Sequence, residues 1–546
     1  MCGIFCLVQY GGNSIDLELA CRCLDKLVPR GPDAKNYYLI KMADVEIFLG
    51  FTRLAIMDTS MAGIQPFHSS DNKIHAICNG EIYNYKELAK NNGIKMKTCC
   101  DCEIIIPLYE KLGFHRLIYD ELYAEFAMVL VDEKNKSVMA ARDRYGVRPL
   151  YYGYNEKTKM VGFSSELKAL HPVMEFAEQL PPYKYLKMNL DLEKNPYHNA
   201  KNMLEFVQYI SYPSSVAANH ITEHNYLKYI NEYLTEAVRK RLTADRPIGF
   251  LLSGGLDSSL ITAIAARILG PDKIVCFSIG LPNSPDVMAA KEVVSFLGIK
   301  KHHVILFDVE KGFRKLSDVI EAIESYDVTT IRASTPQYMM AKYIKENTDI
   351  RVLLSGEGSD EIHGSYRYFR DAPCKENFYL ETIRLLKDLY MFDNLRTDRT
   401  MAAFGLEVRV PFLDYDYVNL ITGMDPELLM YKHNRMEKKI IRDSFKGYLP
   451  DQILYRPKEA FSDAVSSNEV NWAKYIQKIS NEVISDEELI NSPFIINRPM
   501  TKDALYFRRI FSTLYPGRDN VIPYYWLPKF QSEEVLDPSA TVLKCY

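Results

Sequence analysis

The feature that most constrains the fold of this 546-residue chain is a regular alternation of strand-like and helix-like segments after residue 225. An apolar strand pattern at Ile248–Leu252 leads into a glycine loop and then into a helix pattern at Leu260–Leu269. Such alternation predicts a doubly wound parallel sheet of the α/β class. It continues through Ile274–Ile279, Val287–Leu297, His303–Leu306, Gln337–Asn347 and Arg351–Leu354.

The N-terminal part of the chain has a different pattern, since its short strand-like runs are broken by turn residues. Together with two helix patterns, they predict an α+β domain with antiparallel sheets. Prolines and turn residues at 181–215 predict a connector. Because 546 residues exceed what one core supports, we expect domains at 2–185 and 216–546, joined by 186–215. The strand runs are Phe5–Tyr10, Val45–Leu49, Ala76–Cys78, Ala127–Val131, Val138–Ala140 and Leu150–Tyr154, and the helix patterns are Asp16–Leu27 and Glu103–Leu112.

Composition narrows the class of protein. A net charge of −4 argues against a nucleic-acid partner or an acidic membrane surface. No basic segment precedes an apolar stretch at the N-terminus, and no apolar run reaches the ~20 residues of a spanning helix. Eleven cysteines are too few for a disulfide scaffold in a chain of this length. We therefore expect a cytoplasmic enzyme with reduced thiols.

Two glycine loops follow predicted strands. In the first, Ser253–Ser259 (SGGLDSS), glycines allow backbone N–H groups to approach a phosphate, and serines add donors at a helix start. The loop lacks the Gly-Lys-Ser/Thr ending of a Walker A motif. The second loop is Ser355–Glu361 (SGEGSDE). Asp257 and Asp360 are candidates to hold Mg²⁺ against phosphates, although Asp360 could equally cap a helix.

Three further side chains are candidates for chemistry. Lys458 and Arg409 are candidates to neutralise charge on the phosphates, but each alone is more often a surface cation. Cys2 follows the initiator methionine, so removal of Met1 places a thiol and an α-amine on one residue. That amine has an unperturbed pKa of about 7.7–8.0 and is able to take the thiol proton. Cys2 has an alternative interpretation as a small buried residue of the first strand.

The chain carries an ordered set of motifs: MCGIF at 1–5, RGPD at 30–33, RLAI at 53–56, NGEIYN at 79–84, RDRYGVRPL at 142–150, SGGLDSS at 253–259, GLPNSPD at 280–286, YDVTTIRAS at 326–334, SGEGSDE at 355–361, EVRVPFLD at 407–414 and RPKEAFSD at 456–463. This set resembles asparagine synthetase (glutamine-hydrolysing), which joins a class II glutamine amidotransferase to a PP-loop ATP pyrophosphatase domain. The resemblance implies an N-terminal-nucleophile αββα sandwich followed by an adenylating α/β domain.

The resemblance implies a glutaminase site in the N-terminal domain. Cys2 attacks the glutamine side-chain amide, and Asn79 with the Gly80 backbone N–H forms the oxyanion hole. Arg53 holds the glutamine α-carboxylate. Other implied glutamine-binding residues are Leu54, Ala55, Ile56, Met57, Glu81 and Asp101.

In the second domain the resemblance implies synthesis of asparagine from aspartate via β-aspartyl-AMP. The reaction consumes ATP and glutamine-derived ammonia, and releases AMP, pyrophosphate and glutamate. Glu357 faces the intermediate as a base, and Lys458 is also catalytic. The implied metal ligands are Asp257 and Asp360. The implied ATP contacts are Leu252, Ser253, Gly254, Gly255, Asp257, Ser258, Ile279, Ser355 and Gly356. The expected partners are the small-molecule substrates, with a homodimer as the candidate assembly.

Two rival interpretations are weighed against this one. A β-lactam-type synthetase uses the same adenylating fold, but it normally lacks the Cys2 nucleophile. A non-catalytic glutamine or nucleotide sensor is disfavoured by the retained catalytic set. Two departures from the family pattern stand out: Cys99 and Cys100 precede Asp101, where Gly-Ser is common, and His363 and Ser365 replace an aromatic residue and a glycine. We expect the first to reshape the glutamine pocket and the second the aspartate pocket.

Overall fold

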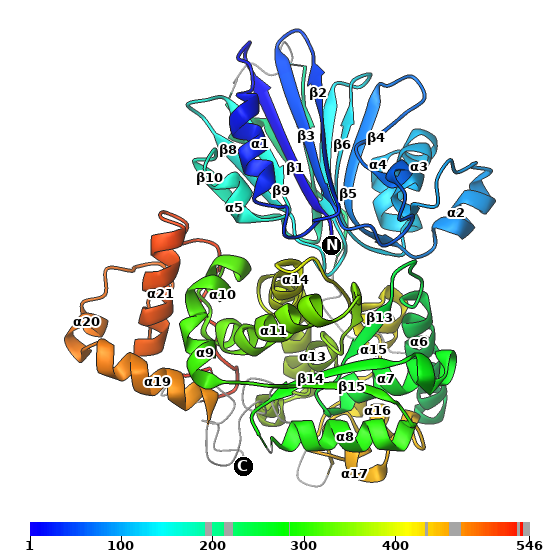
Figure 1. The fold of residues 1–546 in the computed structure, drawn as a ribbon, viewed down its shortest axis with the longest axis vertical. Coiled ribbons are helices and arrows are strands. Elements are labelled where there is room, and N and C mark those ends of the chain that lie inside the picture. The colour runs from blue at the N-terminus through cyan, green and yellow to red at the C-terminus, as the bar shows by residue number, and fades with distance from the viewer. Residues whose placement is uncertain are drawn as a thin grey trace. The chain divides into compact units, whose positions relative to one another are not determined.

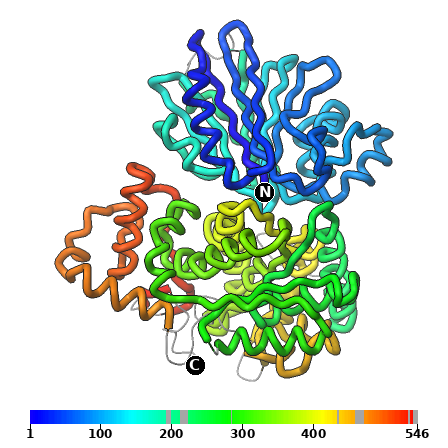
Figure 2. The backbone as a smooth tube through the Cα atoms, in the orientation of Figure 1, coloured from blue at the N-terminus to red at the C-terminus, as the bar shows by residue number. Residues whose placement is uncertain are grey.

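The computed structural model describes residues 1–191, 199–211, 222–282, 284–431, 435–457, 471–531 and 535–538, which form two compact units. The first unit comprises Met1–Ser211 with two short later segments, Ala244–Arg246 and Ala402–Glu407. The second unit holds the remainder. In Figure 2 the first unit is traced mainly in blue and cyan, and the second in green to red.

The first unit contains two six-stranded antiparallel sheets (Figure 1). The strand order is β10-β8-β9-β1-β3-β2 in one sheet and β12-β11-β7-β6-β5-β4 in the other. The strands are β1 (Gly3–Tyr10), β2 (Ala34–Lys41), β3 (Val45–Arg53), β4 (Phe67–His68), β5 (Ile74–Ile82), β6 (Ala124–Asp132), β7 (Ser137–Arg142), β8 (Tyr151–Asn155), β9 (Met160–Ser164), β10 (Phe176–Gln179), β11 (Lys184–Asn189) and β12 (Leu204–Gln208).

The core of this unit lies between the two sheets. Alternate residues of β1, such as Ile4 and Val8, pack with Val129 and Val131 of β6 in one buried cluster, as expected for strands with one face turned inward. Helices α1 (Leu17–Asp25) and α5 (Leu167–Leu170) contact the first sheet, and α3 (Ile105–Leu112) contacts β5 of the second. The αββα prediction is confirmed. The remaining helices are α2 (Tyr85–Asn92) and α4 (Phe114–Arg116).

The segment expected to be a connector carries two strands. β11 pairs with β7 and with β12, so the second sheet continues beyond residue 185. Leu186 and Met188 are buried, at the two-residue spacing of a strand. The prolines at 181 and 182 lie just before β11 and thus mark the start of a strand rather than a linker.

The second unit is built on a five-stranded sheet with the order β15-β14-β13-β16-β17, and its first four strands are parallel. Helices α8 and α11 contact β14, and Figure 1 shows them on opposite sides of that strand. The doubly wound prediction is confirmed. The strands are β13 (Ile248–Leu251), β14 (Val275–Gly280), β15 (Lys301–Leu306), β16 (Val352–Leu354) and β17 (Glu407–Arg409). The main helices are α6 (Glu223–Lys240), α7 (Leu256–Leu269), α8 (Pro285–Leu297), α9 (Val309–Arg314), α10 (Leu316–Ile323), α11 (Val328–Asn347), α12 (Ser359–His363), α13 (Lys375–Asp388), α14 (Asp393–Ala402), α15 (Tyr415–Thr422), α16 (Lys439–Ser444), α17 (Asp451–Leu454), α19 (Trp472–Val483), α20 (Asp486–Ile490) and α21 (Lys502–Leu514).

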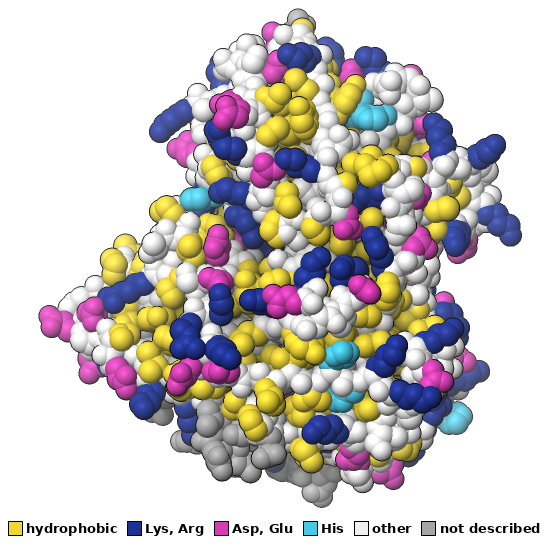
Figure 3. Space-filling model, in the orientation of Figure 1, with side chains coloured by type: hydrophobic (Ala, Val, Ile, Leu, Met, Phe, Trp, Pro, Cys, Tyr) yellow, Lys and Arg dark blue, Asp and Glu magenta, His cyan; other side chains and the backbone are white. Residues whose placement is uncertain are grey.

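Charges of both signs are interspersed on the face shown in Figure 3. Within the described ranges, no helix combines the length and apolar character needed to cross a bilayer.

Candidate functional site

Cys2 directly precedes β1 and faces the end of β3. The pairing of Gly3 with Thr52 places Cys2 beside the residues that follow β3, and the Cys2 Sγ lies 3.7 Å from the Leu54 carbonyl oxygen. Arg30 Nε donates to the Cys2 carbonyl oxygen at 2.9 Å. Burial raises the pKa of the Cys2 thiol to about 11, so the thiol is protonated near neutrality while Met1 is present.

Met1 is fully buried ahead of this thiol. Arg148 Nη1 donates to the Met1 Sδ at 2.9 Å, and burial lowers the pKa of the Met1 α-amine to about 6. In this form of the chain the Cys2 nitrogen belongs to a peptide bond and cannot accept a proton. Cys2 therefore acquires its own base only when Met1 is removed.

Asn79 and Gly80 lie on β5, which packs against β1 and β3 across the core. The Asn79 side chain is 0% exposed, and neither its Oδ1 nor its Nδ2 has a hydrogen-bond partner among the described residues. A Cβ at Gly80 would lie 2.3 Å from the Glu125 carbonyl oxygen, so only glycine fits there. A buried amide without a partner costs about 1–3 kcal/mol, and a bound oxyanion would use its donor.

Three charged residues predicted to bind glutamine are buried in the same unit. Arg53, at the end of β3, donates to the carbonyl oxygens of Asp58 and Ser60, so the following loop wraps its guanidinium. Asp101 Oδ2 accepts from the Ile82 N–H at 2.6 Å, which places Asp101 beside Glu81. One guanidinium and two carboxylates suit the zwitterionic end of an amino acid. The predicted neighbours Leu54, Ala55, Ile56 and Met57 are also buried.

Three cysteines flank Asp101, and two of them, Cys99 and Cys100, are the positions at which the sequence departs from the resembled pattern. Cys100 and Cys102 are buried, whereas Cys99 is exposed. Cys102 Sγ donates to the Gly80 carbonyl oxygen at 3.6 Å. The Cys99 N–H donates to Asp58 Oδ2 at 3.0 Å, which ties this stretch to the loop around Arg53.

The second unit has a cavity of about 240 Å³ at the carboxyl ends of β13, β14 and β16. This is the edge at which parallel-sheet enzymes bind ligands. Of the predicted ATP contacts, the cavity is lined by Leu252, Ser253, Asp257, Ser258, Ile279, Ser355 and Gly356. Gly255 lines a smaller adjoining cavity. Gly254 lines neither, but its φ of +80° and the Asp286 carbonyl oxygen 2.5 Å from a would-be Cβ require glycine.

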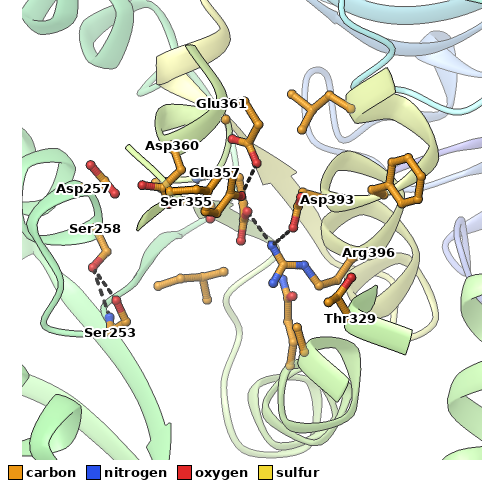
Figure 4. A pocket seen from close by; sticks show the side chains of 18 of the residues that line it. Ser253, Asp257, Ser258, Thr329, Ser355, Glu357, Asp360, Glu361, Asp393 and Arg396 are labelled. Atoms are coloured by element: carbon orange, nitrogen blue, oxygen red, sulfur yellow. Dashed lines mark hydrogen bonds and ion pairs between the residues drawn. The ribbon is translucent and has the colours of Figure 1, made fainter. Parts of the chain in front are cut away.

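The serines of the first glycine loop hold its shape (Figure 4). Ser253 Oγ lies 3.0 Å from Ser258 Oγ and accepts from the Gly255 N–H at 3.3 Å. Helix α7 begins at Leu256, directly behind this loop. The unpaired N–H groups at the start of a 14-residue helix favour an anion at this position.

The two predicted metal ligands converge on a lysine that sequence reasoning missed. Lys438 Nζ lies 2.8 Å from both Asp257 carboxylate oxygens and 2.7 Å from Asp360 Oδ1, and the Lys438 side chain is 2% exposed. Ser359 and Ser365 donate to Asp257 and Asp360 at 2.8 and 2.5 Å. A signal did exist, since two carboxylates predicted at one site favour a cation between them. No motif identified Lys438 as that cation.

The same two carboxylates suit Mg²⁺. Within the described residues, no group of three or more His, Cys, Asp or Glu side chains is arranged to hold a metal by itself. Mg²⁺ is usually held by one or two carboxylates together with substrate phosphates. Asp257 and Asp360, which already meet at one cation, fit that role next to a phosphate-binding loop.

At the other side of the cavity, carboxylates surround a guanidinium (Figure 4). Arg396 Nη2 lies 2.6 Å from Glu357 Oε2 and 2.8 Å from Asp393 Oδ1. Burial, followed by the Asp393 charge, raises the pKa of Glu361 well above its usual range, and Tyr366 donates to Glu361 at 2.5 Å. This side can therefore hold both charged groups of an amino acid.

The two cations predicted to neutralise phosphate charge are Lys458 and Arg409. Lys458 falls outside the described residues. Arg409 is fully buried and donates to the Arg241 and Thr243 carbonyl oxygens at 3.0 and 2.7 Å. The prediction that Arg409 neutralises phosphate charge is therefore wrong, because its guanidinium supports the backbone.

His363 and Ser365 do not line the cavity, so any effect on the aspartate pocket passes through the residues they contact. Ser365 donates to Asp360, as described above. His363 Nδ1 lies 2.7 Å from the Ser359 carbonyl oxygen, and its Nε2 lies 3.1 Å from the Tyr417 hydroxyl. Ser365 therefore contacts Asp360 directly, whereas His363 contacts Ser359, whose hydroxyl donates to Asp257.

Comparison with known proteins matches the two halves of the chain to two domain families. Family models of a glutamine amidotransferase domain and of asparagine synthase match residues 1–227, and residues 229–384 and 375–521, respectively. The chain is 60% identical over 550 residues to a probable asparagine synthetase (glutamine-hydrolysing) of Acanthamoeba polyphaga mimivirus, with both chains fully covered. It is 38% identical to the asparagine synthetases (glutamine-hydrolysing) of Gallus gallus and Homo sapiens, over 566 and 569 residues, covering 100% of this chain and 99% of each relative.

Proposed function

The chain belongs to the asparagine synthetase (glutamine-hydrolysing) family, and from that premise we propose how its residues perform the reaction. The protein is a ligase that makes asparagine from aspartate, ATP and glutamine. Glutamine hydrolysis is assigned to the first unit, and asparagine formation to the cavity of the second.

In the first unit, Cys2 is the nucleophile once Met1 is removed. Its thiol proton moves to its own α-amine, and Sγ attacks the glutamine side-chain carbonyl carbon. Negative charge then gathers on the former amide oxygen, where the Asn79 amide and the Gly80 N–H stabilise it. The C–N bond breaks, the proton passes to the departing nitrogen, and ammonia leaves a glutamyl thioester. Water hydrolyses the thioester to glutamate.

Arg53 holds the glutamine α-carboxylate, while Glu81 and Asp101 hold its α-ammonium group. Their burial is important, since charge-assisted hydrogen bonds are stronger away from water. The observation that carries this half of the proposal is the buried Asn79 amide with no partner in the described structure. A group of this kind is costly to the fold and useful to an oxyanion.

In the second unit, an aspartate β-carboxylate oxygen attacks the α-phosphorus of ATP, and pyrophosphate leaves at the Ser253–Ser259 loop. Asp257 and Asp360 would hold Mg²⁺, which neutralises phosphate charge when bound. Lys438 supplies a second positive charge at the same place. We also assign Lys458 to this neutralisation, on the family resemblance alone.

Ammonia completes the synthesis. Neutral ammonia attacks the acyl carbon of β-aspartyl-AMP, the bond to the phosphate oxygen breaks, and AMP departs. Glu357 accepts the proton released from nitrogen. Arg396, 2.6 Å away, orients the Glu357 carboxylate toward the cavity.

The location and assembly are also part of the proposal. No disulfide joins the cysteines that the structure describes, which supports a reducing compartment such as the cytoplasm. A homodimer that binds neither nucleic acid nor membrane is proposed, and sedimentation analysis would test its assembly.

Product analysis with Cys2→Ala tests the whole scheme. The variant should lose glutamine-dependent synthesis but retain synthesis from added ammonia, with AMP and pyrophosphate as products. Cys21→Ala, at a half-buried cysteine of α1, serves as the matched control and should retain both activities. Formation of ADP, or loss of ammonia-dependent synthesis in folded Cys2→Ala, would contradict the scheme.

A further inference from the structure

One face of helix α11 runs along the second-unit cavity. Thr329, Ala333, Gln337 and Met340 all line it, at spacings of four, four and three residues. Residues with these spacings share one side of an α-helix. Gln337 therefore lies about 12 Å along the helix from Thr329, and Thr329 lies near Arg396 (Figure 4).

The cavity is chemically different at its two sides. Glu357 and Glu361 follow β16, on one side of β13 in the sheet. On the other side of β13 is β14, and the lining there is largely apolar, with Leu251, Phe277 and Ile279. The acyl chemistry is assigned to the β16 side of the cavity, and the phosphate loop follows β13. The base of the nucleotide is therefore assigned to the remaining side, at β14. Apolar side chains suit the faces of a purine.

Gln337 contributes a polar atom without a partner to the lining of this cavity. Its side chain is 3% exposed, and its Oε1 is buried without a hydrogen bond among the described residues. The nearby Ser278 hydroxyl is already committed, since it donates to the Leu252 carbonyl oxygen at 2.5 Å. Within the described lining, Gln337 carries the only carboxamide. Such a group remains costly until a ligand pairs with it.

The position of Gln337 is set by its neighbours. Pro336 lies inside α11 and lacks an N–H, which frees the Arg332 carbonyl oxygen one turn earlier. The Trp472 indole N–H donates to that oxygen at 2.9 Å. Thr335 donates to the Ile331 carbonyl oxygen at 3.0 Å. The helix therefore passes Pro336 with its freed carbonyl satisfied, and Gln337 is held facing the cavity.

We propose that the Gln337 carboxamide recognises the adenine of ATP, with Oε1 accepting from the 6-amino group and the amide N–H donating to an adjacent ring nitrogen. A glutamine amide and the adenine edge are complementary in this way. A purine with no 6-amino group leaves the buried oxygen unpaired. This assignment rests on the proposed function, in which ATP occupies the cavity.

Ammonia-dependent synthesis with altered nucleotides tests the proposal. The wild-type kcat/KM should be about tenfold to a hundredfold higher for ATP than for purine riboside triphosphate, which lacks only the 6-amino group. In Gln337→Met the value for ATP should fall to near that for the analogue, mainly through KM, while the analogue's own value stays unchanged. Gln452→Met, at an exposed glutamine outside the cavity, should keep the wild-type preference.

Equal losses on both nucleotides in Gln337→Met, or no wild-type preference, would overturn the assignment. Calorimetric titration with AMP and purine riboside monophosphate gives a readout independent of turnover. The ratio of the two affinities should fall toward one in Gln337→Met. Glutaminase activity of Gln337→Met reports whether the variant folds. The preference of the wild-type enzyme for ATP over the analogue is measured without any variant. Failure of the proposed function is distinguishable, because wild-type protein would then form no AMP from any nucleotide.

Discussion

The ammonium group of Lys438 lies 2.8 Å from both carboxylate oxygens of Asp257, in a position where the lysine side chain is almost wholly buried. Asp360 accepts from the same Nζ at 2.7 Å. The two loops that present these carboxylates are therefore held together by a cation even without nucleotide. The two carboxylates are therefore organised before ATP binds, which lowers the cost of assembling the site.

Lys438→Met should destabilise the second unit. Removing one partner of a buried ion pair costs about 3–5 kcal/mol, and here two carboxylates would lose their shared cation. Ammonia-dependent synthesis should fall more than about a hundredfold, by analogy with other charge-stabilising groups, with glutaminase activity retained. Urea unfolding with and without Mg²⁺ and a non-hydrolysable ATP analogue measures the stability. The exposed neighbour Lys439→Met is the control, and wild-type synthesis by Lys438→Met would refute the assignment.

Asn79→Ala should separate stability from activity. Because the Asn79 amide is buried without a partner, its removal should leave the free energy of unfolding unchanged or slightly increased. Glutamine hydrolysis should fall by about 10²–10³ as the oxyanion donor is lost.

The matched control for this substitution is Asn84→Ala. Asn84 donates to the Glu121 carbonyl oxygen at 2.8 Å and accepts from the Tyr123 N–H at 3.1 Å. Its loss should reduce stability and leave hydrolysis intact. Unfolding curves and glutamate release measure both effects, and an Asn79→Ala enzyme with normal hydrolysis would count against the oxyanion hole.

Retention of Met1 should silence the glutaminase. With Met1 in place, the raised pKa of about 11 keeps the Cys2 thiol protonated, so alkylation by iodoacetamide should be slow at pH 7 and should accelerate toward pH 11. A chain that begins at Cys2 should react faster near neutrality, since its α-amine accepts the proton. Peptide mass spectrometry of Cys2 on cleaved and uncleaved tagged chains measures this. Equal rates would remove the α-amine from the mechanism.

His363→Phe should flatten the dependence of stability on pH. Burial lowers the pKa of His363 to about 3, below its ordinary value of about 6.5. Between these values the unfolded chain binds a proton that the folded chain does not, so stability falls as pH decreases from about 6.5, by up to about 1.4 kcal/mol per pH unit. Urea unfolding at pH 7.5, 6.5 and 5.5 should show a smaller decline in the variant. His115→Phe, at an exposed position, should keep the wild-type slope.

Local pattern was enough to predict four strands of the second unit, β13 to β16, but only half of those in the first, since β2, β4, β9 and β10 were also missed. The alternation around Ser253–Ser259 needs only neighbouring residues, because periodicity and turn chemistry are local properties. The same reasoning missed β11 and β12. The prolines just before β11 favoured a connector, although β11 has a short two-residue alternation of buried side chains. Arg409 was assigned to phosphates because a lone cation in a motif carries no information about its partners.

By itself, the sequence determined the fold class of each half, the motif set and the catalytic chemistry that such residue types can perform. Only the tertiary structure decided that Lys438 joins Asp257, 181 positions earlier, and that the Asn79 amide and the Gln337 Oε1 have no hydrogen-bond partner among the described residues. Contacts of this kind depend on how distant segments pack. Pairing and burial are therefore properties of the folded chain, whereas propensity and spacing are properties of the sequence.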